Sequence, residues 1–345
     1  MTCRLTLPAL ALVLAAACTT PAPGPATPAP VTEARIAMGT ELRLTAWTID
    51  EAAALDAFDA VYAEFERLEQ LMSTWRPASE ISRLNAAAGG APVRVSPDVI
   101  DVLQLAAGIS ESTGGKFDIT FGALSGLWRF DEDMDGSIPD RAEVEARLPL
   151  IAWEDVEIDA DAGTARLARA GMSVNLGGIG KGYAVDRGVD ILREAGLDTF
   201  LIQAGGDLYV GGEPEGRPWR LGIQDPRGPA GTPFARMELT DATFSTSGDY
   251  ERYFVRDGVR YHHILDPDLG QPARTSRSVT IVTSRAVLAD ALSTGIFILG
   301  AEEGLALVER LDDVEGVIVD ADNQVHVSSG LEGRLEMLSP PGDGP

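Results

Sequence analysis

The chain contains only two lysines, and both lie beside glycines. Lys181 stands within VNLGGIGKGYAVD, residues 174 to 186, and Lys116 stands within GGKFD. Glycine allows a backbone to approach a ligand closely, and the lysine ammonium acts on phosphate as a compact point charge. The pairing predicts a phosphate-bearing ligand. The alternative is a tight turn that carries a solvated lysine.

The glycine-rich run does not match the common nucleotide-binding motifs. In a P-loop, the first glycine would fall at Asn175, and Gly182 stands where Ser or Thr would follow the lysine. The spacing of the Rossmann motif is also absent. A glycine loop that leads into a helix nevertheless leaves free backbone N–H groups, which can bind an anion.

Two oxygen-bearing side chains, Asp290 and Thr294, are four residues apart in VLADALSTGIFIL. If this segment is helical, they share one face of the helix. A carboxylate and a hydroxyl are hard oxygen donors, which suit Mg²⁺ better than Zn²⁺. The pair therefore indicates a magnesium site, unless both side chains only decorate a solvated face.

Histidine chemistry has three candidates, His262, His263 and His326. Adjacent residues on a strand point to opposite faces, so only one of His262 and His263 can face a site. Two structural histidines on a polar hairpin are the alternative. We expect His326 to be a plain strand residue.

An acidic segment, DEDMDG over 131 to 136, begins like a calcium-binding loop. The bidentate glutamate that would complete such a loop is replaced by Ala142. We therefore expect an acidic surface loop.

The elements that position these residues alternate along the chain. Asp50 is placed to cap an amphipathic helix over 51–72, which follows a strand within 41–49. Another helix begins at Pro97. The glycine run leads into a helix over 183–195 that ends at Gly196.

Most predicted strands fall in the second half of the chain. The last helix contains 287–299, and Asp257-Gly258 turns a hairpin. We expect strands at 199–204, 207–210, 219–223, 278–283, 316–319 and 324–327. The order predicts a single domain of the α/β (α+β) class, with a mixed β-sheet core and packed helices.

The composition of the chain argues against two classes of function, nucleic-acid binding and cysteine chemistry. With 345 residues, 45% of them hydrophobic, the chain can bury a real core. Its formal net charge of −25 and the lack of a basic cluster argue against nucleic-acid binding. Both cysteines, Cys3 and Cys18, precede the predicted domain, which excludes disulfides and cysteine chemistry there.

The N-terminal segment has the pattern of an export signal. Arg4 precedes an apolar run and then small residues before Cys18, as in bacterial lipoproteins, although an ordinary cleavage site at Ala15 and Ala17 is the alternative. We predict a signal peptide over 1–18 with Cys18 lipidated, a Pro/Ala-rich tether over 19–33 and a flexible tail over 339–345. The folded domain, 34–338, would then lie on the periplasmic side of a bacterial membrane.

Together the segments resemble the ApbE family of flavin transferases, the FAD:protein FMN transferases. The similarity extends over roughly 36–330. The segments that carry it are MGT (38–40), LMSTWRPASEISRLN (71–85), GGKFDITFGALSGLW (114–128), NLGGIGKGYAVD (175–186), QAGGDLYVGG (203–212), STSGDYERYF (245–254), RYHHILDPDLGQP (260–272) and SVTIVTSRAVLADALSTGIFILG (278–300).

The resemblance implies Mg²⁺-dependent cleavage of the FAD pyrophosphate and transfer of FMN, through a phosphoester, to a threonine of a partner flavoprotein. It implies that Asp290, Thr294 and the carbonyl of Gly180 hold Mg²⁺ and that His263 is the base that takes the threonine proton. The residues that it implies around FAD are Met38, Trp75, Lys116, Phe117, Asp118, Gly177, Lys181, Tyr183 and Ile264.

The chain departs from the family pattern at two positions. Asn175 replaces a common Asp, and Gly180 replaces a common Ala. A carbonyl ligand needs no side chain, so the second change preserves it. Hydrolysis of FAD to FMN and AMP, and storage of FAD without turnover, are the competing functions.

Overall fold

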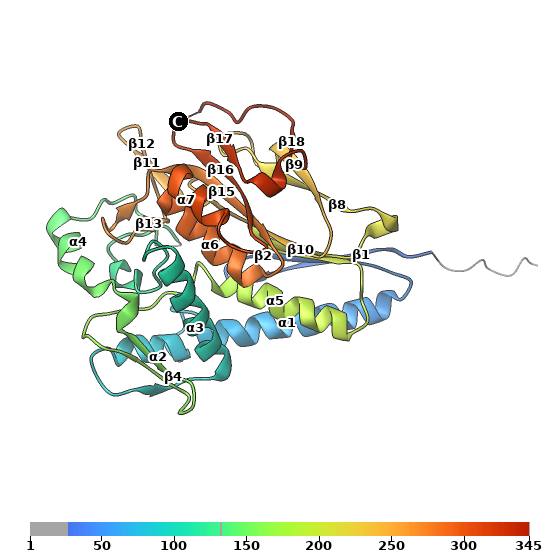
Figure 1. The fold of residues 1–345 in the computed structure, drawn as a ribbon. Coiled ribbons are helices and arrows are strands. Elements are labelled where there is room, and N and C mark those ends of the chain that lie inside the picture. Colours follow the sequence, from blue (N-terminus) through green and yellow to red (C-terminus); the bar gives the residue numbers. More distant parts are fainter. Residues whose placement is uncertain (1–26, 132, 345) are drawn as a thin grey trace, which may run out of the picture.

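An eight-stranded sheet forms the centre of the structure, a computed structural model that describes residues 27–131 and 133–344 (Figure 1). All neighbouring strands in it are antiparallel. The mixed sheet that we expected is therefore wrong, whereas the α+β class is confirmed. The strands in spatial order are β1 (Ala29–Ala37), β2 (Thr40–Thr48), β6 (Phe200–Ala204), β7 (Asp207–Gly211), β10 (Ala242–Gly248), β15 (Ser276–Thr283), β16 (Glu315–Asp320) and β17 (Val325–Val327).

Helices cover one face of this sheet, with α1 and α5 side by side beneath it (Figure 1). The helix predicted over 51–72 is confirmed as α1, and the Asp50 side chain caps it by accepting from the Ala53 N–H at 3.0 Å. The α-helices of the described residues are α1 (Glu51–Met72), α2 (Glu80–Ala86), α3 (Pro97–Ser112), α4 (Arg141–Arg147), α5 (Gly180–Glu194), α6 (Ala286–Leu299) and α7 (Ala301–Val308).

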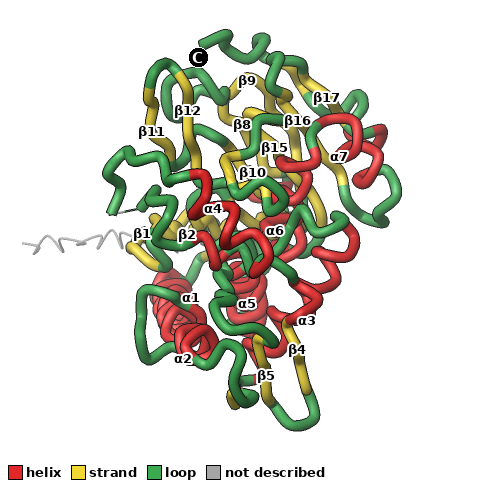
Figure 2. Tube along the Cα trace, turned by 90° about the vertical axis from the view of Figure 1, so that its left-hand side faces the viewer, coloured by secondary structure: helices red, strands yellow, loops and turns green. Residues whose placement is uncertain are grey.

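Smaller sheets complete the fold. One of them packs on the face of the central sheet opposite α1 and α5 (Figure 2). It consists of β8 (Trp219–Gln224), β9 (Pro233–Leu239) and β18 (Glu336–Met337). The others are β3 (Val93–Arg94) with β5 (Thr164–Leu167) and β4 (Val156–Asp159), β11 (Tyr253–Arg256) with β12 (Val259–His262), and β13 (Leu265–Asp266) with β14 (Gln271–Pro272).

The two faces of the central sheet bury separate cores. Phe200 and Ile202 of β6 pack into the core shared with the helices, whereas the intervening Leu201 packs on the opposite side. Val282 of β15 also joins the second core, with Phe234 of β9. This alternation follows from the two-residue period of a strand.

Both ends of the predicted domain differ from expectation. Strand β1 begins at Ala29, so the last five residues of the predicted tether, 29–33, belong to the sheet. Of the tail predicted to be flexible, the described residues Gly342 and Gly344 bond to the body of the protein. The Gly342 N–H donates to Asp225, and Arg227 donates to the Gly344 carbonyl at 3.1 Å. Cys18 and the rest of the predicted signal peptide lie outside the described residues.

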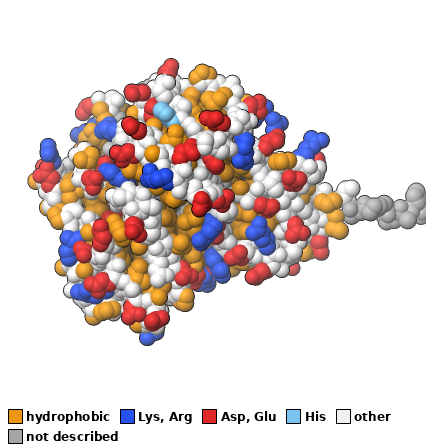
Figure 3. Space-filling model, viewed as in Figure 1, with side chains coloured by type: hydrophobic (Ala, Val, Ile, Leu, Met, Phe, Trp, Pro, Cys, Tyr) orange, Lys and Arg blue, Asp and Glu red, His pale blue; other side chains and the backbone are white. Residues whose placement is uncertain are grey.

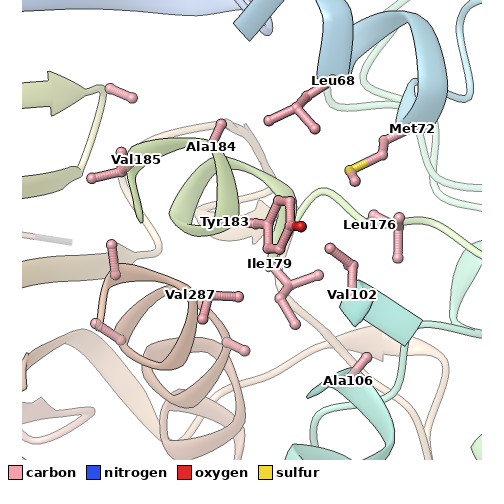
Figure 4. Packing of buried hydrophobic residues seen from close by; sticks show 14 of the residues in the cluster. Leu68, Met72, Val102, Ala106, Leu176, Ile179, Tyr183, Ala184, Val185 and Val287 are labelled. Atoms are coloured by element: carbon pink, nitrogen blue, oxygen red, sulfur yellow. The ribbon is translucent and has the colours of Figure 1, made fainter. Parts of the chain in front are cut away.

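Helix α5 begins at Gly180, three residues before the start that we predicted. Packing stabilises the first turns of α5. Figure 4 shows Ile179, Tyr183 and Val185 among apolar side chains of neighbouring elements. Among them are Met72 of α1 and Val287 of α6. Tertiary packing here outweighs the low helix propensity of Gly180 and Gly182.

Gly182 marks the closest approach of α5 and α6. A Cβ added there would lie 2.3 Å from the Ala286 carbonyl oxygen and 2.8 Å from the Asp290 Cβ. We expect Gly182→Ala to lower the free energy of unfolding by about 1–3 kcal/mol, measured by chemical denaturation, because the backbones must separate. Gly108→Ala in α3 is the matched control, since its Cβ would meet nothing within 4 Å. It should leave stability unchanged or raise it by up to about 1 kcal/mol; an equally stable Gly182→Ala would contradict the close contact.

Candidate active site

The predicted Mg²⁺ ligands come together where α5 begins beside α6. The Gly182 N–H donates to Asp290 Oδ2 at 2.9 Å, which fixes that carboxylate against the first turn of α5. Thr294 lies one turn further along α6, and a Cβ added at Gly178 would lie 3.4 Å from its Oγ1. The structure thus places a carboxylate, a hydroxyl and the main chain around Gly180 in one place.

Lys181 lies between two buried carboxylates. Its Nζ is 3.1 Å from Asp207 Oδ2 and 3.6 Å from Asp290 Oδ1, and it donates to the Gly177 carbonyl at 3.2 Å. Burial by itself would lower the pKa of Lys181, but the charges of Asp207 and Asp290 raise it above the usual value. The lysine is therefore a firmly charged cation within the site.

The Asp290 carboxylate is strongly perturbed. Burial raises its pKa, the negative charge of Asp207 raises it further, and Lys181 together with the Gly182 N–H opposes the rise. Glu251 lies close enough for Lys181 and Asp207 to influence it, and burial raises its pKa as well. Perturbed carboxylates gathered in one place are typical of functional sites.

His263 follows the last residue of β12, and its backbone N–H donates to the Arg252 carbonyl at 3.1 Å. Its Nδ1 is buried without a hydrogen-bond partner. Burial lowers the pKa of His263 well below 6.5, and the charges of Arg252 and Lys181 lower it further. The imidazole is neutral at physiological pH and can accept a proton.

His262 has a different environment, as the alternation of the strand predicts. Its side chain is buried, its Nε2 lies 2.7 Å from the Ala273 carbonyl oxygen, and its ring packs edge-on against Phe297. His326 lies on β17 and bonds Asp320 at 2.7 Å. The charge of Lys181 is among the causes that lower the pKa of His263 and is not among those that act on His262, so His263 is the histidine of this pair that faces the Lys181 cluster.

The lowered pKa of His263 predicts the pH dependence of a reaction in which this side chain acts as the base. A base whose pKa is lowered stays neutral, and hence active, until the pH falls through that lowered value. We expect the acidic limb of the kcat/KM profile to lie below pH 6.5, the ordinary imidazole value. A limb at or above this value would show that another group, or a solvated histidine, controls the reaction.

Several residues predicted to contact FAD lie at the protein surface or in turns. Met38 occupies the turn between β1 and β2 with a φ of 49°, and Trp75 is 67% exposed just beyond α1. Lys116 is paired with Asp266 and Asp268, at 3.0 and 2.8 Å, so it is not an isolated cation.

The other predicted FAD contacts are more enclosed. Phe117 and Ile264 are 4% exposed, so their side chains belong to the core. Buried Asp118 accepts hydrogen bonds from Thr120 and from the Trp153 N–H. For such residues a contact with FAD stays a prediction.

Tyr183 and Gly177 flank the lysine on α5 and on the loop before it. The Tyr183 hydroxyl donates to Asp98 at 3.0 Å, which links α5 to α3. The Gly177 N–H donates to the Asn175 side chain at 2.8 Å. Asn175, which stands in place of a common Asp, therefore orders the glycine loop.

Sequence reasoning missed Asp207 and its partner Ser245. Asp207 is buried at the start of β7, a strand whose five residues are all buried, and the Ser245 hydroxyl donates to it. A carboxylate at the start of a fully buried strand is rare unless it is paired. An aspartate at the start of the apolar segment DLYVG could therefore have identified Asp207 as a paired, and hence candidate, site residue.

The donor set fits a hard cation. In the part of the chain that the structure describes, no three His, Cys, Asp or Glu side chains form a metal-binding cluster. The predicted ligands, Asp290, Thr294 and the Gly180 carbonyl, are instead oxygens of the kind that bind Mg²⁺. The half-buried ammonium of Lys181, 3.6 Å from Asp290 Oδ1, shows that this place stabilises a cation.

On the face shown in Figure 3, acidic and basic side chains are interspersed. Within 27–131 and 133–344, no helix is long and apolar enough to cross a membrane.

Comparison with known proteins agrees with the geometry. The chain matches the ApbE family over residues 38–318. It is 34% identical over 321 residues to a FAD:protein FMN transferase of Treponema pallidum, with 88% of each chain covered. The ApbE protein of Thermotoga maritima has a similar structure, with a TM-score of 0.82, 31% identity, and 89% of this chain and 99% of that one covered. The flavin transferase ApbE from Vibrio cholerae follows with a TM-score of 0.79, 28% identity and coverage of 89% and 99%. The chain is thus an FMN-transferring enzyme that uses FAD, and it belongs to the ApbE family.

Proposed function

We propose that the enzyme uses Mg²⁺ to transfer FMN from FAD to a threonine of a partner flavoprotein. The observation that carries this proposal is the grouping of Asp290, Thr294 and the start of α5 with the neutral base His263. Oxygen ligands of this kind suit Mg²⁺, and a threonine hydroxyl is a poor nucleophile that needs a base. The Mg²⁺ and the acceptor residue are supported by the donor chemistry of the site.

In the reaction, the threonine oxygen forms a bond to the phosphorus of the FMN half of FAD. The pyrophosphate P–O bond breaks, and AMP leaves with the bonding electrons. The hydroxyl proton goes to His263. Bound Mg²⁺ would neutralise charge on the phosphoryl oxygens.

Residues of the chain hold the other parts of the site in position. Asp290 and Thr294 of α6 and the carbonyl of Gly180 would hold the metal ion. The N–H groups of Gly180 and Gly182 at the start of α5 are bonded to the Leu176 carbonyl and to Asp290, so this turn holds the carboxylate in place and does not offer those two groups to an anion. Burial of His263 keeps its ring neutral.

The test is to incubate purified protein, residues 27 to 345, with FAD, Mg²⁺ and a flavoprotein domain that carries an acceptor threonine. Mass spectrometry of the acceptor is expected to show one added FMN, formed only with Mg²⁺. FMN and AMP released beside an unmodified acceptor would favour hydrolysis. Intact bound FAD would contradict transfer.

We also propose that the chain is exported and anchored through a lipid on Cys18, on the periplasmic side of a bacterial membrane. Small residues before this cysteine support the proposal. Labelling of cells with a radioactive fatty acid should modify the wild type and not Cys18→Ser. Equal labelling of both would remove Cys18 as the anchor.

A further inference from the structure

The ammonium of Lys181 lies among three oxygen atoms of the protein. Its ammonium lies 3.1 Å from Asp207 Oδ2, 3.6 Å from Asp290 Oδ1 and 3.2 Å from the Gly177 carbonyl oxygen. Asp207 and Asp290 are 3% and 4% exposed. Such carboxylates are stable as anions only when a cation compensates them.

Lysine and a metal ion would compete for the same oxygen of Asp290. Oδ2 already accepts from the Gly182 N–H, at 2.9 Å. Oδ1 is the oxygen that faces the ammonium. A cation that binds Asp290 through Oδ1 must therefore displace Lys181 or share this oxygen with it.

Asp207 provides a second position for the ammonium. It lies at the start of β7, directly opposite Ser245 on the neighbouring strand β10. The Ser245 hydroxyl donates to its Oδ1. Its Oδ2 faces Lys181. The ammonium is already closer to Asp207 than to Asp290, at 3.1 and 3.6 Å. Because the lysine stem is flexible, a small rotation can move it away from Asp290 while it keeps its contact with Asp207.

We propose that Lys181 occupies the cation position in the metal-free enzyme and that Asp207 retains the lysine when Mg²⁺ binds Asp290. The inference rests on the proposed Mg²⁺ site. It assigns Asp207 as a positioning residue that acts on the metal site through Lys181. It also accounts for the choice of lysine, since a compact ammonium resembles a metal ion more closely than a planar guanidinium does.

The charges in the site set the direction of each effect. Arg252 and Glu251 also act on Lys181 or Asp207, but they have opposite signs and are unchanged in the test. Lys181→Met leaves two buried carboxylates without their cation, so Mg²⁺ should bind more tightly. Asp207→Asn leaves Lys181 with Asp290 as its remaining carboxylate partner in the cluster, so Mg²⁺ should bind more weakly.

The experiment is calorimetric titration of the purified protein with MgCl₂, without FAD. We expect Asp207→Asn to weaken Mg²⁺ binding at least tenfold, Lys181→Met to strengthen it, and the double variant to bind at least as tightly as the wild type. Asp320→Asn is the matched control, because Asp320 lies at the end of β16 and bonds His326. Its Mg²⁺ affinity should equal that of the wild type.

Two other patterns would overturn the inference. If the double variant binds as weakly as Asp207→Asn, Asp207 is itself a metal ligand. If Lys181→Met leaves the affinity unchanged, the lysine does not compete with the metal. A wild type that binds no Mg²⁺ would overturn the proposed metal site as well, which separates that failure from the other two.

Thermal unfolding gives a second readout that does not depend on activity. In EDTA, Lys181→Met should unfold at a lower temperature than the wild type, and Mg²⁺ should raise its Tm by more than it raises that of the wild type. Lys181→Gln, which keeps a donor for the Gly177 carbonyl, serves if the methionine variant does not fold. An equal gain in Tm for variant and wild type would contradict the inference.

Discussion

Replacing His263 with alanine is expected to abolish FMN transfer while leaving FAD affinity nearly unchanged. The imidazole is neutral because burial lowers its pKa, and it is the histidine beside the Lys181 cluster. A positioned base contributes typically ~10²–10⁴-fold to a rate. Transfer should therefore fall by about this factor, as measured by the mass of the acceptor over time, with FAD binding followed by fluorescence.

His326→Ala is the matched control for this variant. His326 lies on β17 and bonds Asp320, at the far edge of the sheet order. Its removal should leave the transfer rate unchanged. Transfer by His263→Ala at the wild-type rate would eliminate His263 as the base, and loss of FAD binding together with transfer would point to a structural role.

Replacing Asp290 with asparagine is expected to remove Mg²⁺ binding and activity together. The amide oxygen can still accept from the Gly182 N–H, so the contact between α5 and α6 is preserved. The charge that would hold the metal is lost. Metal-ion stabilisation of a phosphoryl transition state is worth several kcal/mol, and about 1.4 kcal/mol is a factor of ten. Transfer should fall roughly a thousandfold.

The measurement is the transfer rate across a range of Mg²⁺ concentrations, with Asp320→Asn as the parallel control. The control should show the wild-type dependence on Mg²⁺. An Asp290→Asn enzyme that remains fully active, or that needs the same Mg²⁺ concentration as the wild type, would reject Asp290 as a ligand.

Among the described residues, local patterns in the sequence predicted four of the seven α-helices and nine of the eighteen strands. Apolar residues at helical spacing and an N-cap specify α1, and these signals lie within the helix itself. Strand β1 was not predicted, because the Pro/Ala-rich composition of 21–30 suggested a tether. It forms because it lies at the edge of the sheet, where a proline can be tolerated.

The site was predictable only where its residues are close in the sequence or belong to a motif. Asp290 and Thr294 share a helix, so their spacing brings them together. Asp207 contacts Lys181 because α5 packs against β7 on one face of the central sheet. No local sequence pattern predicts that contact. The buried position of Phe117 likewise depends on how α6 packs, which the motif around it does not reveal.

The hairpin of β11 and β12 separates the environments of two adjacent histidines, of which His263 is the one that we propose as the base. His262 is the last residue of β12 and His263 follows it, so their side chains point to opposite sides, and the pairing of Tyr253 with His262 sets which side each takes. The pairing is fixed at the Asp257-Gly258 turn, where both residues adopt positive φ. One residue inserted or removed there would exchange the faces of all side chains on one strand. The number of residues in a solvent-exposed turn thus determines which histidine faces the Lys181 cluster at the other end of the ribbon.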